Sequence, residues 1–217
     1  MTIRVLLADD HAVVRNGLAA ILQTQTDFVV VGMAANGREA LAQVEQHCPQ
    51  VVVMDIAMPE LNGIEAARQM RLSCPQTQIV LLSMHHTPEH IMRALQAGAR
   101  GYVLKESASD EVIEAIRTVH RGQRYLSHDI SQTLLSHYAT QEEGAEPQEP
   151  LASLSARERE VLQLLVEGRS LGEIAQRTSL ATTTVKSYRS RMMQKLAIDS
   201  LPDLVRFAIR HGMIPRE

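Results

Sequence analysis

Five polar side chains each come at or just after the end of a short apolar stretch in the first half of the sequence: Asp9, Asp10, Asp55, Ser83 and Lys105. Neighbouring carboxylates repel one another unless a cation holds them together, and oxygen ligands suit Mg²⁺. A phosphoryl group carried by one carboxylate would be neutralised by the metal and the ammonium group, and would accept a hydrogen bond from the hydroxyl. These residue types therefore indicate phosphoryl chemistry on an aspartate.

Asp55 is the carboxylate that we expect to receive the phosphoryl group. It follows four apolar residues, 51–54, which predict a strand buried on both faces, and Pro59 and Gly63 interrupt the chain soon afterwards. A buried carboxylate without partners costs several kcal/mol or more, so it normally lies where partners are available. Aspartyl phosphates are established covalent intermediates. We therefore expect Asp55 to face a metal ion and a phosphoryl donor.

The elements that position these residues alternate along residues 1–122. Apolar runs predict strands at 3–8, 30–35, 51–54, 79–83 and 101–105. Amphipathic stretches predict helices at 12–25, 37–47, 62–72, 88–97 and 108–121. Such alternation indicates a doubly wound α/β domain with a five-stranded parallel sheet. Ligands bind at the carboxyl ends of the strands in such sheets, so the five polar residues should converge on one rim.

These positions, with Met58-Pro59 and Gly63 after the third strand, resemble the flavodoxin-like receiver domain of two-component response regulators. The resemblance implies phosphorylation of Asp55 by a partner histidine kinase, with Ser83 and Lys105 assisting. It implies Mg²⁺ as the cofactor, with these metal-site residues: Asp10, Asp55, the backbone carbonyl of Ala57, and Asp9 nearby. It also implies that Tyr102 is a switch aromatic, which turns inward beside Ser83 on phosphorylation. His11 follows the acidic pair, but its position assigns it no role.

Two other functions use the same acidic residues. A phosphatase with an aspartate nucleophile usually carries a second Asp two residues further on, but that position is Ala57. The missing acid favours a long-lived acyl phosphate, so we do not expect an enzyme. A receiver that regulates without phosphorylation would keep the pocket only for folding and metal binding. It would show no acyl phosphate in the presence of Mg²⁺ and acetyl phosphate.

Charge is unevenly divided along the chain of 217 residues. Residues 1–122 carry 10 Lys and Arg against 13 Asp and Glu, and residues 123–150 carry 1 against 5. Residues 151–217 carry 11 against 7, a net charge of +4. This basic end suggests an anionic partner, although so modest a charge also arises by chance.

The sequence shows neither a membrane span nor a secretory signal. No apolar run approaches the roughly 20 residues of a transmembrane helix, and the first ten residues lack the apolar core of a signal peptide. Only two cysteines are present, Cys48 and Cys74, and they form no CxxC pair. This pattern indicates a reducing, cytoplasmic location and no membrane partner.

A linker and a small helical domain follow the α/β domain. Residues 139–150 are acidic, contain two prolines and lack apolar periodicity, as a flexible linker does; residues 127–138 favour a short connecting helix. We therefore assign 123–150 to a linker and 151–217 to a second domain. Four helical stretches are expected there: 155–167, 171–177, 181–196 and 201–211.

Helical spacing sorts residues 181–196 into two faces. Val185, Met192 and Leu196 form one stripe and should be buried. The opposite face is small and polar and is bordered by Lys186 and Arg191. Small residues allow close approach to a major groove, while cations meet phosphates or guanine edges. A solvated amphipathic helix, or a protein-binding one, would show the same pattern.

The segment before this helix distinguishes these possibilities. Residues 170–180 form a short helical pattern and a brief turn, which resembles a helix-turn-helix. Residues 151–217 closely resemble the four-helix LuxR-type DNA-binding domain, and the whole chain resembles NarL/FixJ-type response regulators. The resemblance implies base contacts by Lys186, Ser187 and Ser190, and phosphate contacts by Thr184, Arg189 and Arg191. It implies a DNA-bound homodimer through the last helix, by way of Leu201, Leu204, Val205 and Ala208.

The sequence therefore predicts a bacterial transcription factor that is switched by Mg²⁺-dependent phosphorylation of Asp55 and binds double-stranded promoter DNA. Phosphorylation would release the recognition helix from the receiver and allow dimerisation.

Overall fold

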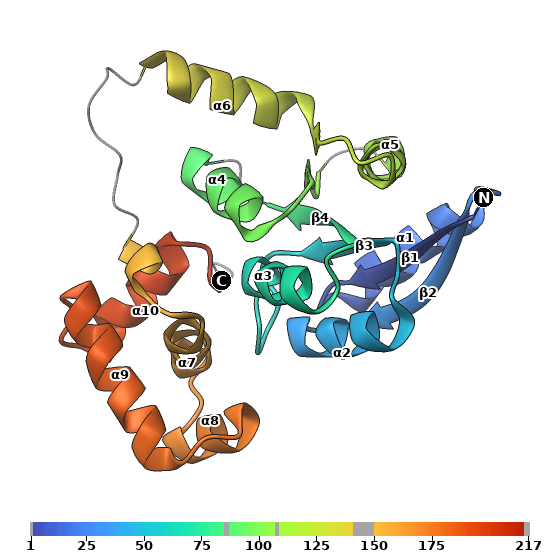
Figure 1. Ribbon diagram of the computed structural model, residues 1–217. Coiled ribbons are helices and arrows are strands. Elements are labelled where there is room, and N and C mark those ends of the chain that lie inside the picture. The colour runs from blue at the N-terminus through green and yellow to red at the C-terminus, as the bar shows by residue number, and fades with distance from the viewer. Residues whose placement is uncertain (1, 85–86, 107–108, 141–149, 215–217) are drawn as a thin grey trace. The chain divides into compact units, whose positions relative to one another are not determined.

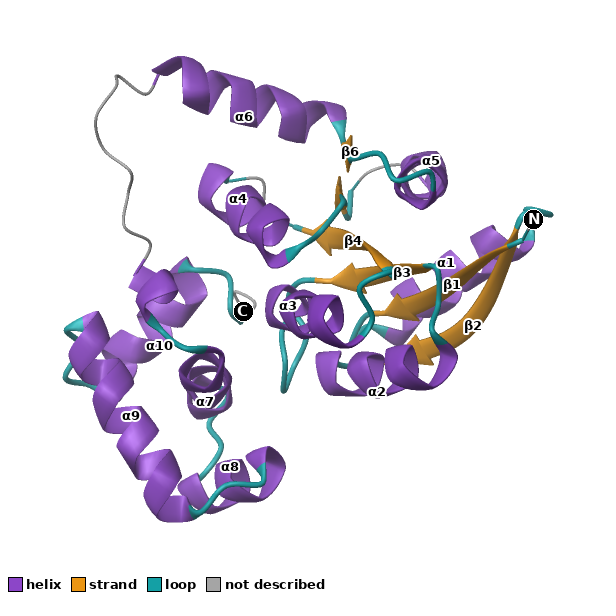
Figure 2. Ribbon diagram, viewed as in Figure 1, coloured by secondary structure: helices purple, strands orange, loops and turns teal. Residues whose placement is uncertain are grey.

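A computed structural model describes residues 2–84, 87–106, 109–140 and 150–214 of the chain. The chain forms two compact units, Met1–Glu142 and Glu143–Glu217. The first unit is a parallel sheet covered by helices on both faces, and the second is helical (Figures 1 and 2). No helix in the described ranges is long and apolar enough to cross a membrane.

The sheet of the first unit has the strand order β2-β1-β3-β4-β5-β6, and all of its strand pairs are parallel. The strands are β1 (Ile3–Ala8), β2 (Phe28–Ala34), β3 (Val51–Asp55), β4 (Gln78–Ser83), β5 (Gly101–Leu104) and β6 (Tyr125–Leu126). The helices are α1 (Ala12–Gln23), α2 (Gly37–His47), α3 (Gly63–Ser73), α4 (Pro88–Ala97), α5 (Ser109–His120) and α6 (His128–Thr140). The predicted doubly wound α/β architecture is confirmed.

Alternating strand residues feed two separate apolar cores. On one face, Leu6, Val52 and Leu81 pack with residues of α2, α3 and α4. On the other face, Val53 and Leu82 pack with residues of α1 and α5. All five residues of β3 are buried, as the continuous apolar run predicts. A strand covered on both faces has only its ends open to solvent and ligands.

The sheet has six strands, whereas the sequence predicts five. The sixth, β6, has two residues, which pair with Gly101 and Tyr102 of β5. Two residues are too few to produce a recognisable period, so only tertiary pairing reveals this strand. Helix α6 follows, and its Ile130 and Leu134 are buried in the α4 face of the core. Residues 125–140 of the expected linker therefore lie within the first unit.

The second unit contains a 3₁₀ turn at Pro150–Ser153 and four helices: α7 (Ala156–Val166), α8 (Leu171–Thr178), α9 (Thr182–Leu196) and α10 (Leu201–Arg210). The four helices match the predicted stretches. Ser155 and Ser170 each start a helix with a capping box, in which the serine and a glutamate three residues later satisfy each other's backbone N–H. The apolar faces of the four helices share one core, which includes Leu162, Ile174 and Val185.

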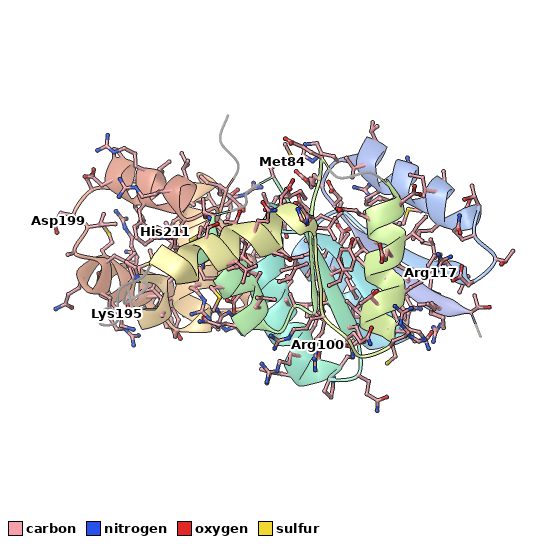
Figure 3. The ribbon with its side chains drawn as sticks, turned by 90° about the horizontal axis from the view of Figure 1, so that it is seen from above. Met84, Arg100, Arg117, Lys195, Asp199 and His211 are labelled. Atoms are coloured by element: carbon pink, nitrogen blue, oxygen red, sulfur yellow. The ribbon has the colours of Figure 1, made fainter. Side chains whose placement is uncertain are left out.

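Glu158 links the start of α7 to the end of α9. Its Oε2 accepts hydrogen bonds from the Ser155 backbone N–H at 2.8 Å and from Lys195 Nζ at 2.7 Å. Figure 3 labels Lys195 among the side chains of the second unit. Burial raises the pKa of this carboxyl group, but the bonds from Lys195 and Ser155 outweigh burial and leave the pKa lowered. Since the pKa is lower in the folded state, Glu158 stabilises the fold above its unfolded pKa, and this contribution disappears as the pH falls.

Glu158→Gln should therefore reduce the stability of the second unit at neutral pH but not in acid. We expect a loss of about 1 kcal/mol at pH 7, because Lys195 is partly exposed and water screens the pair. The difference should shrink as the pH falls below the unfolded pKa of a glutamate, about 4.3, and should vanish only below the lower pKa of the folded state. The free energy of unfolding of the full chain is measured at several pH values by urea unfolding, followed by circular dichroism. Glu114→Gln, at an exposed position on α5, is the control. A pH-independent difference would contradict the ion-pair explanation.

Candidate functional site

The predicted rim residues lie at the carboxyl ends of adjacent parallel strands. Asp55 and Ser83 are the last residues of β3 and β4, and Lys105 directly follows β5. Asp9 directly follows β1, and its backbone N–H donates to the Ala34 carbonyl at 3.1 Å. Because β1, β3, β4 and β5 are neighbours in the sheet, their ends meet at one edge. The predicted convergence is therefore present.

Lys105 joins two of the carboxylates. Its Nζ lies 2.8 Å from Asp9 Oδ2 and 2.8 Å from Asp55 Oδ2. The Lys105 backbone N–H donates to the Ser83 carbonyl at 2.8 Å, which fixes the residue against the end of β4. Asp9, Asp55 and Ser83 are each at most 3% exposed. The geometry therefore gathers two buried carboxylates, a hydroxyl-bearing residue and a cation at one point.

Burial and mutual attraction together set the pKa values of Asp55 and Lys105. Burial raises the pKa of Asp55, and the attraction of Lys105, which lowers it, does not fully offset the effect of burial. Burial lowers the pKa of Lys105, but Asp55 and Asp9 together outweigh it and leave that pKa raised. The ammonium group therefore stays charged, and the Asp55 carboxylate gains from any additional cation that enters the pocket.

The loop after β3 is held in place by backbone contacts. The Asp55 carboxylate accepts a hydrogen bond from the Ala57 backbone N–H. The Ile56 backbone N–H donates a hydrogen bond to the Leu82 carbonyl at 3.0 Å, and the Gly63 backbone N–H donates one to the Ile56 carbonyl at 2.9 Å. Gly63 starts α3, whose N-cap Asn62 accepts a bond from the Glu65 N–H. The metal-ligand role of the Ala57 carbonyl stays a prediction.

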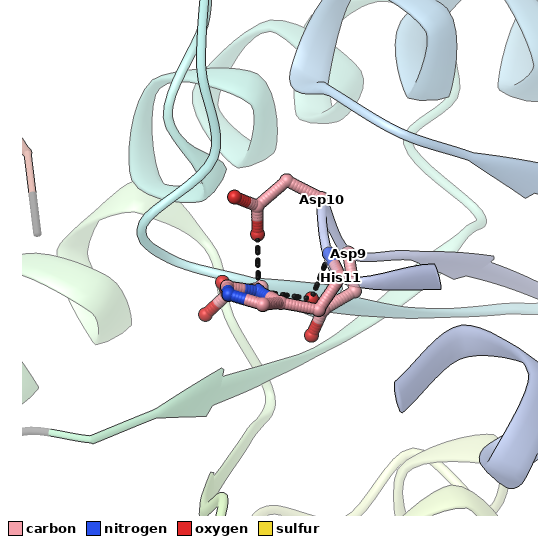
Figure 4. A group of neighbouring side chains, drawn as sticks. Asp9, Asp10 and His11 are labelled. Atoms are coloured by element: carbon pink, nitrogen blue, oxygen red, sulfur yellow. Dashed lines mark hydrogen bonds and ion pairs between the residues drawn. The ribbon is translucent and has the colours of Figure 1, made fainter. Parts of the chain in front are cut away.

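Asp10 and His11 complete the rim (Figure 4). The side chain of Asp10 is 30% exposed, and its Oδ1 lies 2.7 Å from His11 Nδ1. The same nitrogen lies 3.2 Å from Asp9 Oδ1. The sequence assigns no role to His11, because adjacency in the chain does not show which way a ring turns. The structure places this ring between the two carboxylates.

The donor set fits a divalent cation. Asp9, Asp10, His11 and Asp55 each present a ligand atom, and these atoms all lie within 4.8 Å of one another. Asp9 Oδ2 and Asp10 Oδ1 are buried. Lys105 and His11 lie within ion-pair distance of them, but neither oxygen accepts a well-directed hydrogen bond from the residues that the structure describes. Carboxylates in this condition suit a hard cation such as Mg²⁺.

Tyr102 already faces inward. It is fully buried, and its hydroxyl is hydrogen-bonded to the Ser83 side chain. Burial raises its pKa to about 12 despite that bond. The ring lies inward beside Ser83, and its role as a switch stays a prediction. It shares its core with Ile91 of α4 and Ile130 of α6, which cover this end of the sheet.

Helix α9 has the two predicted faces. Val185 and Met192 are fully buried, and Leu196 is partly buried. The exposed residues include four of the predicted DNA contacts: Lys186, Ser187, Ser190 and Arg191. Thr184 and Arg189 are half-buried. The turn from α8 passes through Ser179, a left-handed residue with φ 55°.

Two details shape the exposed face of α9. The Arg191 guanidinium lies over the Tyr188 ring, 5.0 Å from its centroid. Such stacking holds a cation in one orientation. The N-cap residue is Ala181, whose side chain offers no acceptor to the first amides of the helix. An anion can therefore approach this helix end.

Two of the four residues expected at a dimer contact are buried in their own domain. Leu204 and Ala208 have no exposed surface and belong to the core of the second unit. This corrects the expectation that the resemblance gave for those two residues, because they lie on the stripe of α10 that faces the domain's own core. Leu201 is 43% exposed and Val205 is partly exposed.

Comparisons with known proteins match both units. The family model for a response regulator receiver domain matches residues 5–117, and that for bacterial regulatory proteins of the luxR family matches residues 152–208. The chain is 36% identical to the oxygen regulatory protein NreC of Staphylococcus carnosus (strain TM300), over 97% of this chain and 99% of that protein. It is 39% identical to the response regulator UvrY of Escherichia coli (strain K12), over 99% and 97%.

A solved structure supports the same assignment. The chain is similar to the crystal structure of a LuxR-family two-component response regulator from Aurantimonas sp. SI85-9A1, with 34% identity and a TM-score of 0.62. The match covers 64% of this chain and 99% of that one.

Proposed function

The chain belongs to the NarL/FixJ-type two-component response regulators, which join a receiver domain to a LuxR-type DNA-binding domain, and on this premise we propose that phosphorylation of Asp55 controls its binding to promoter DNA. The observation that carries the proposal is Lys105 Nζ at 2.8 Å from both Asp9 and Asp55. The proposal assigns phosphoryl transfer to the first unit, which includes β6 and α6, and DNA binding to residues 151–217.

The Asp55 carboxylate is the nucleophile. One of its oxygens attacks the phosphorus of a phosphohistidine on the partner kinase, or of acetyl phosphate. A P–O bond forms at Asp55, and the bond to the histidine nitrogen or the acetate oxygen breaks. Lys105 neutralises a phosphoryl oxygen and Ser83 donates a hydrogen bond to another. Mg²⁺, held by Asp10, Asp55 and the Ala57 carbonyl with Asp9 nearby, would neutralise the remaining charge.

The product is a signal rather than an intermediate in turnover. Ala57 stands where aspartate phosphatases carry their acid, so no side chain of that kind promotes fast hydrolysis. Phosphorylation adds about −1.5 to −2 charges at the rim. Ser83 must turn toward the new oxygens, and this changes its hydrogen bond to Tyr102. Tyr102 transmits the change to the α4 and α6 side of the core, which it shares.

The exposed face of α9 is the DNA-reading surface. Lys186, Ser187 and Ser190 would contact bases, and Thr184, Arg189 and Arg191 would contact phosphates. The exposed ends of Leu201 and Val205 on α10 remain available for a DNA-bound homodimer. Such a regulator works in the cytoplasm with its kinase, without inserting into a membrane.

Phosphorylation should raise the affinity of the full-length protein for its promoter. A duplex selected from random sequence by the phosphorylated protein serves as the probe, and its binding is compared before and after acetyl phosphate with Mg²⁺. Tighter binding and a dimeric mass on DNA support the proposal. Equal affinity of both forms would point to a receiver that regulates without phosphorylation, and the absence of salt-dependent binding would contradict DNA recognition.

Arg191→Ala should weaken binding to every duplex by a similar factor. A lost phosphate contact flattens the plot of log affinity against log salt by about 0.9 per contact, and the relative preference among sequences should stay unchanged. Fluorescence anisotropy at several salt concentrations measures both. The matched control is Arg157→Ala, which removes an equal charge from α7, where Arg157 pairs with Glu160. An unchanged slope for Arg191→Ala would contradict its phosphate role.

A further inference from the structure

The ring of His11 enters the acidic pocket although the backbone of His11 starts helix α1. His11 is the N-cap residue, yet its side chain makes no capping hydrogen bond. Its backbone N–H instead donates to Asp9 Oδ1 at 2.9 Å, which anchors the residue to the rim. Figure 4 shows the ring turned toward Asp9 and Asp10, with Nδ1 as the contacting atom.

The spacing of the four donors matches one coordination shell. Two opposite ligands of an octahedral ion with bonds of about 2.1 Å lie about 4.2 Å apart, and adjacent ligands lie closer. One ring nitrogen of His11 and one oxygen each of Asp9, Asp10 and Asp55 already lie within 4.8 Å of one another, and Nδ1 is the nitrogen that contacts Asp9 and Asp10. A small contraction around an ion would therefore bring the nitrogen into its shell together with the carboxylates.

We propose that His11 Nδ1 is a direct ligand of the divalent cation in this pocket, and that it shifts the selectivity of the site from Mg²⁺ toward first-row transition ions. The inference rests on the proposed phosphoacceptor pocket and adds a specificity-determining residue to it. Imidazole nitrogen binds Mn²⁺, Co²⁺ and Zn²⁺ more strongly than it binds Mg²⁺, which prefers oxygen.

The exposure of the ring permits the required change of tautomer. Without a metal, Nδ1 faces two carboxylate oxygens, at 2.7 and 3.2 Å, and donates its proton to them. With a metal, the lone pair of Nδ1 faces the ion and the ring proton is carried on Nε2. The side chain is 65% exposed, so water can take up that N–H. No buried donor is left without a partner by the exchange.

Metal titration of the full-length protein by calorimetry tests the proposal. Dissociation constants for Co²⁺ and Mg²⁺ are measured for the wild type, for His11→Ala, and for His128→Ala, an exposed histidine at the start of α6. We expect His11→Ala to weaken Co²⁺ binding about tenfold or more, since even the outer partners of metal ligands contribute that much, with Mg²⁺ binding nearly unchanged. His128→Ala should match the wild type.

A spectroscopic measurement tests the bond itself. Pulsed electron paramagnetic resonance of the Mn²⁺ complex should show coupling to one ¹⁴N nucleus in the wild type and in His128→Ala, and none in His11→Ala. Absence of nitrogen coupling in the wild type, or equal losses for Co²⁺ and Mg²⁺ in His11→Ala, would overturn the inference.

Phosphoryl uptake separates this inference from the proposed function. With saturating Mg²⁺ and acetyl phosphate, the wild type should gain one phosphoryl group, because Asp55 and Lys105 lie in contact in the pocket. Lack of uptake by the wild type would count against the phosphoacceptor proposal, while the metal constants and the nitrogen coupling would still decide the role of His11.

Discussion

Asp55→Asn should abolish phosphoryl uptake by the protein. The substitution keeps the shape of the side chain but replaces the nucleophilic carboxylate by an amide, which cannot form the acyl phosphate. After incubation with Mg²⁺ and acetyl phosphate, the intact mass of the wild type should rise by one phosphoryl group, and that of the variant should stay constant. Lys105 keeps its partner Asp9, 2.8 Å away, so the fold retains a paired cation at this point.

Two further measurements make the Asp55 result specific. Asp129→Asn, at an exposed position on α6, should take up phosphate like the wild type. Mg²⁺ should raise the unfolding temperature of the wild type through mass action more than that of Asp55→Asn, which has lost one carboxylate oxygen from the proposed metal site. Uptake by Asp55→Asn would place the phosphoryl group on another residue. No uptake by either protein would support regulation that does not depend on phosphorylation.

Gly63→Ala should destabilise the receiver unit and damage its pocket. A Cβ atom at Gly63 would lie 2.2 Å from the Asp55 carbonyl oxygen and 3.1 Å from the Ile56 Cα. Both contacts are to backbone atoms, so no flexible side chain can move aside. The chain would have to separate α3 from the end of β3, which we expect to cost about 3 kcal/mol. Phosphoryl uptake should fall as well, because Asp55 would move.

Gly17→Ala is the matched control for Gly63→Ala. Gly17 is an exposed residue of α1, and a Cβ there would meet no atom within 4 Å. Alanine is the better helix former by about 1 kcal/mol, so this variant should be slightly stabilised. Urea unfolding compares the stability of both variants with that of the wild type. Hydrogen exchange in β3 and α3 reports whether these two elements separate in Gly63→Ala. Equal stability of Gly63→Ala and the wild type would mean that α3 can shift without strain.

The expected α/β fold and its rim followed from local patterns. The apolar run before Asp55 and the strands before Asp9, Ser83 and Lys105 were recognisable because a buried parallel strand needs several consecutive apolar residues. Their convergence needed only the general rule that the carboxyl ends of neighbouring parallel strands share an edge. The buried stripe of α9 followed in the same way from a period of 3.6 residues.

Other features depend on contacts that no local pattern contains. Strand β6 exists because Tyr125 and Leu126 pair with β5, not because two residues form a pattern. Helix α6 shows only a weak signal, and its place over the core follows from the burial of Ile130 and Leu134. The burial of Leu204 and Ala208 likewise depends on the helices packed against α10, since an apolar stripe fits a domain core and a dimer interface equally well.

The sequence by itself therefore determined the two domain classes, the order of their main elements and the residue types available for phosphoryl and DNA chemistry. Only the tertiary structure decided that Tyr102 lies inward beside Ser83, that His11 turns into the acidic pocket, and that the Asp55 backbone leaves no room for a Cβ at Gly63. Periodicity records which face of an element is buried. The direction of one ring and the distance between two backbones are set by neighbours far away in the chain.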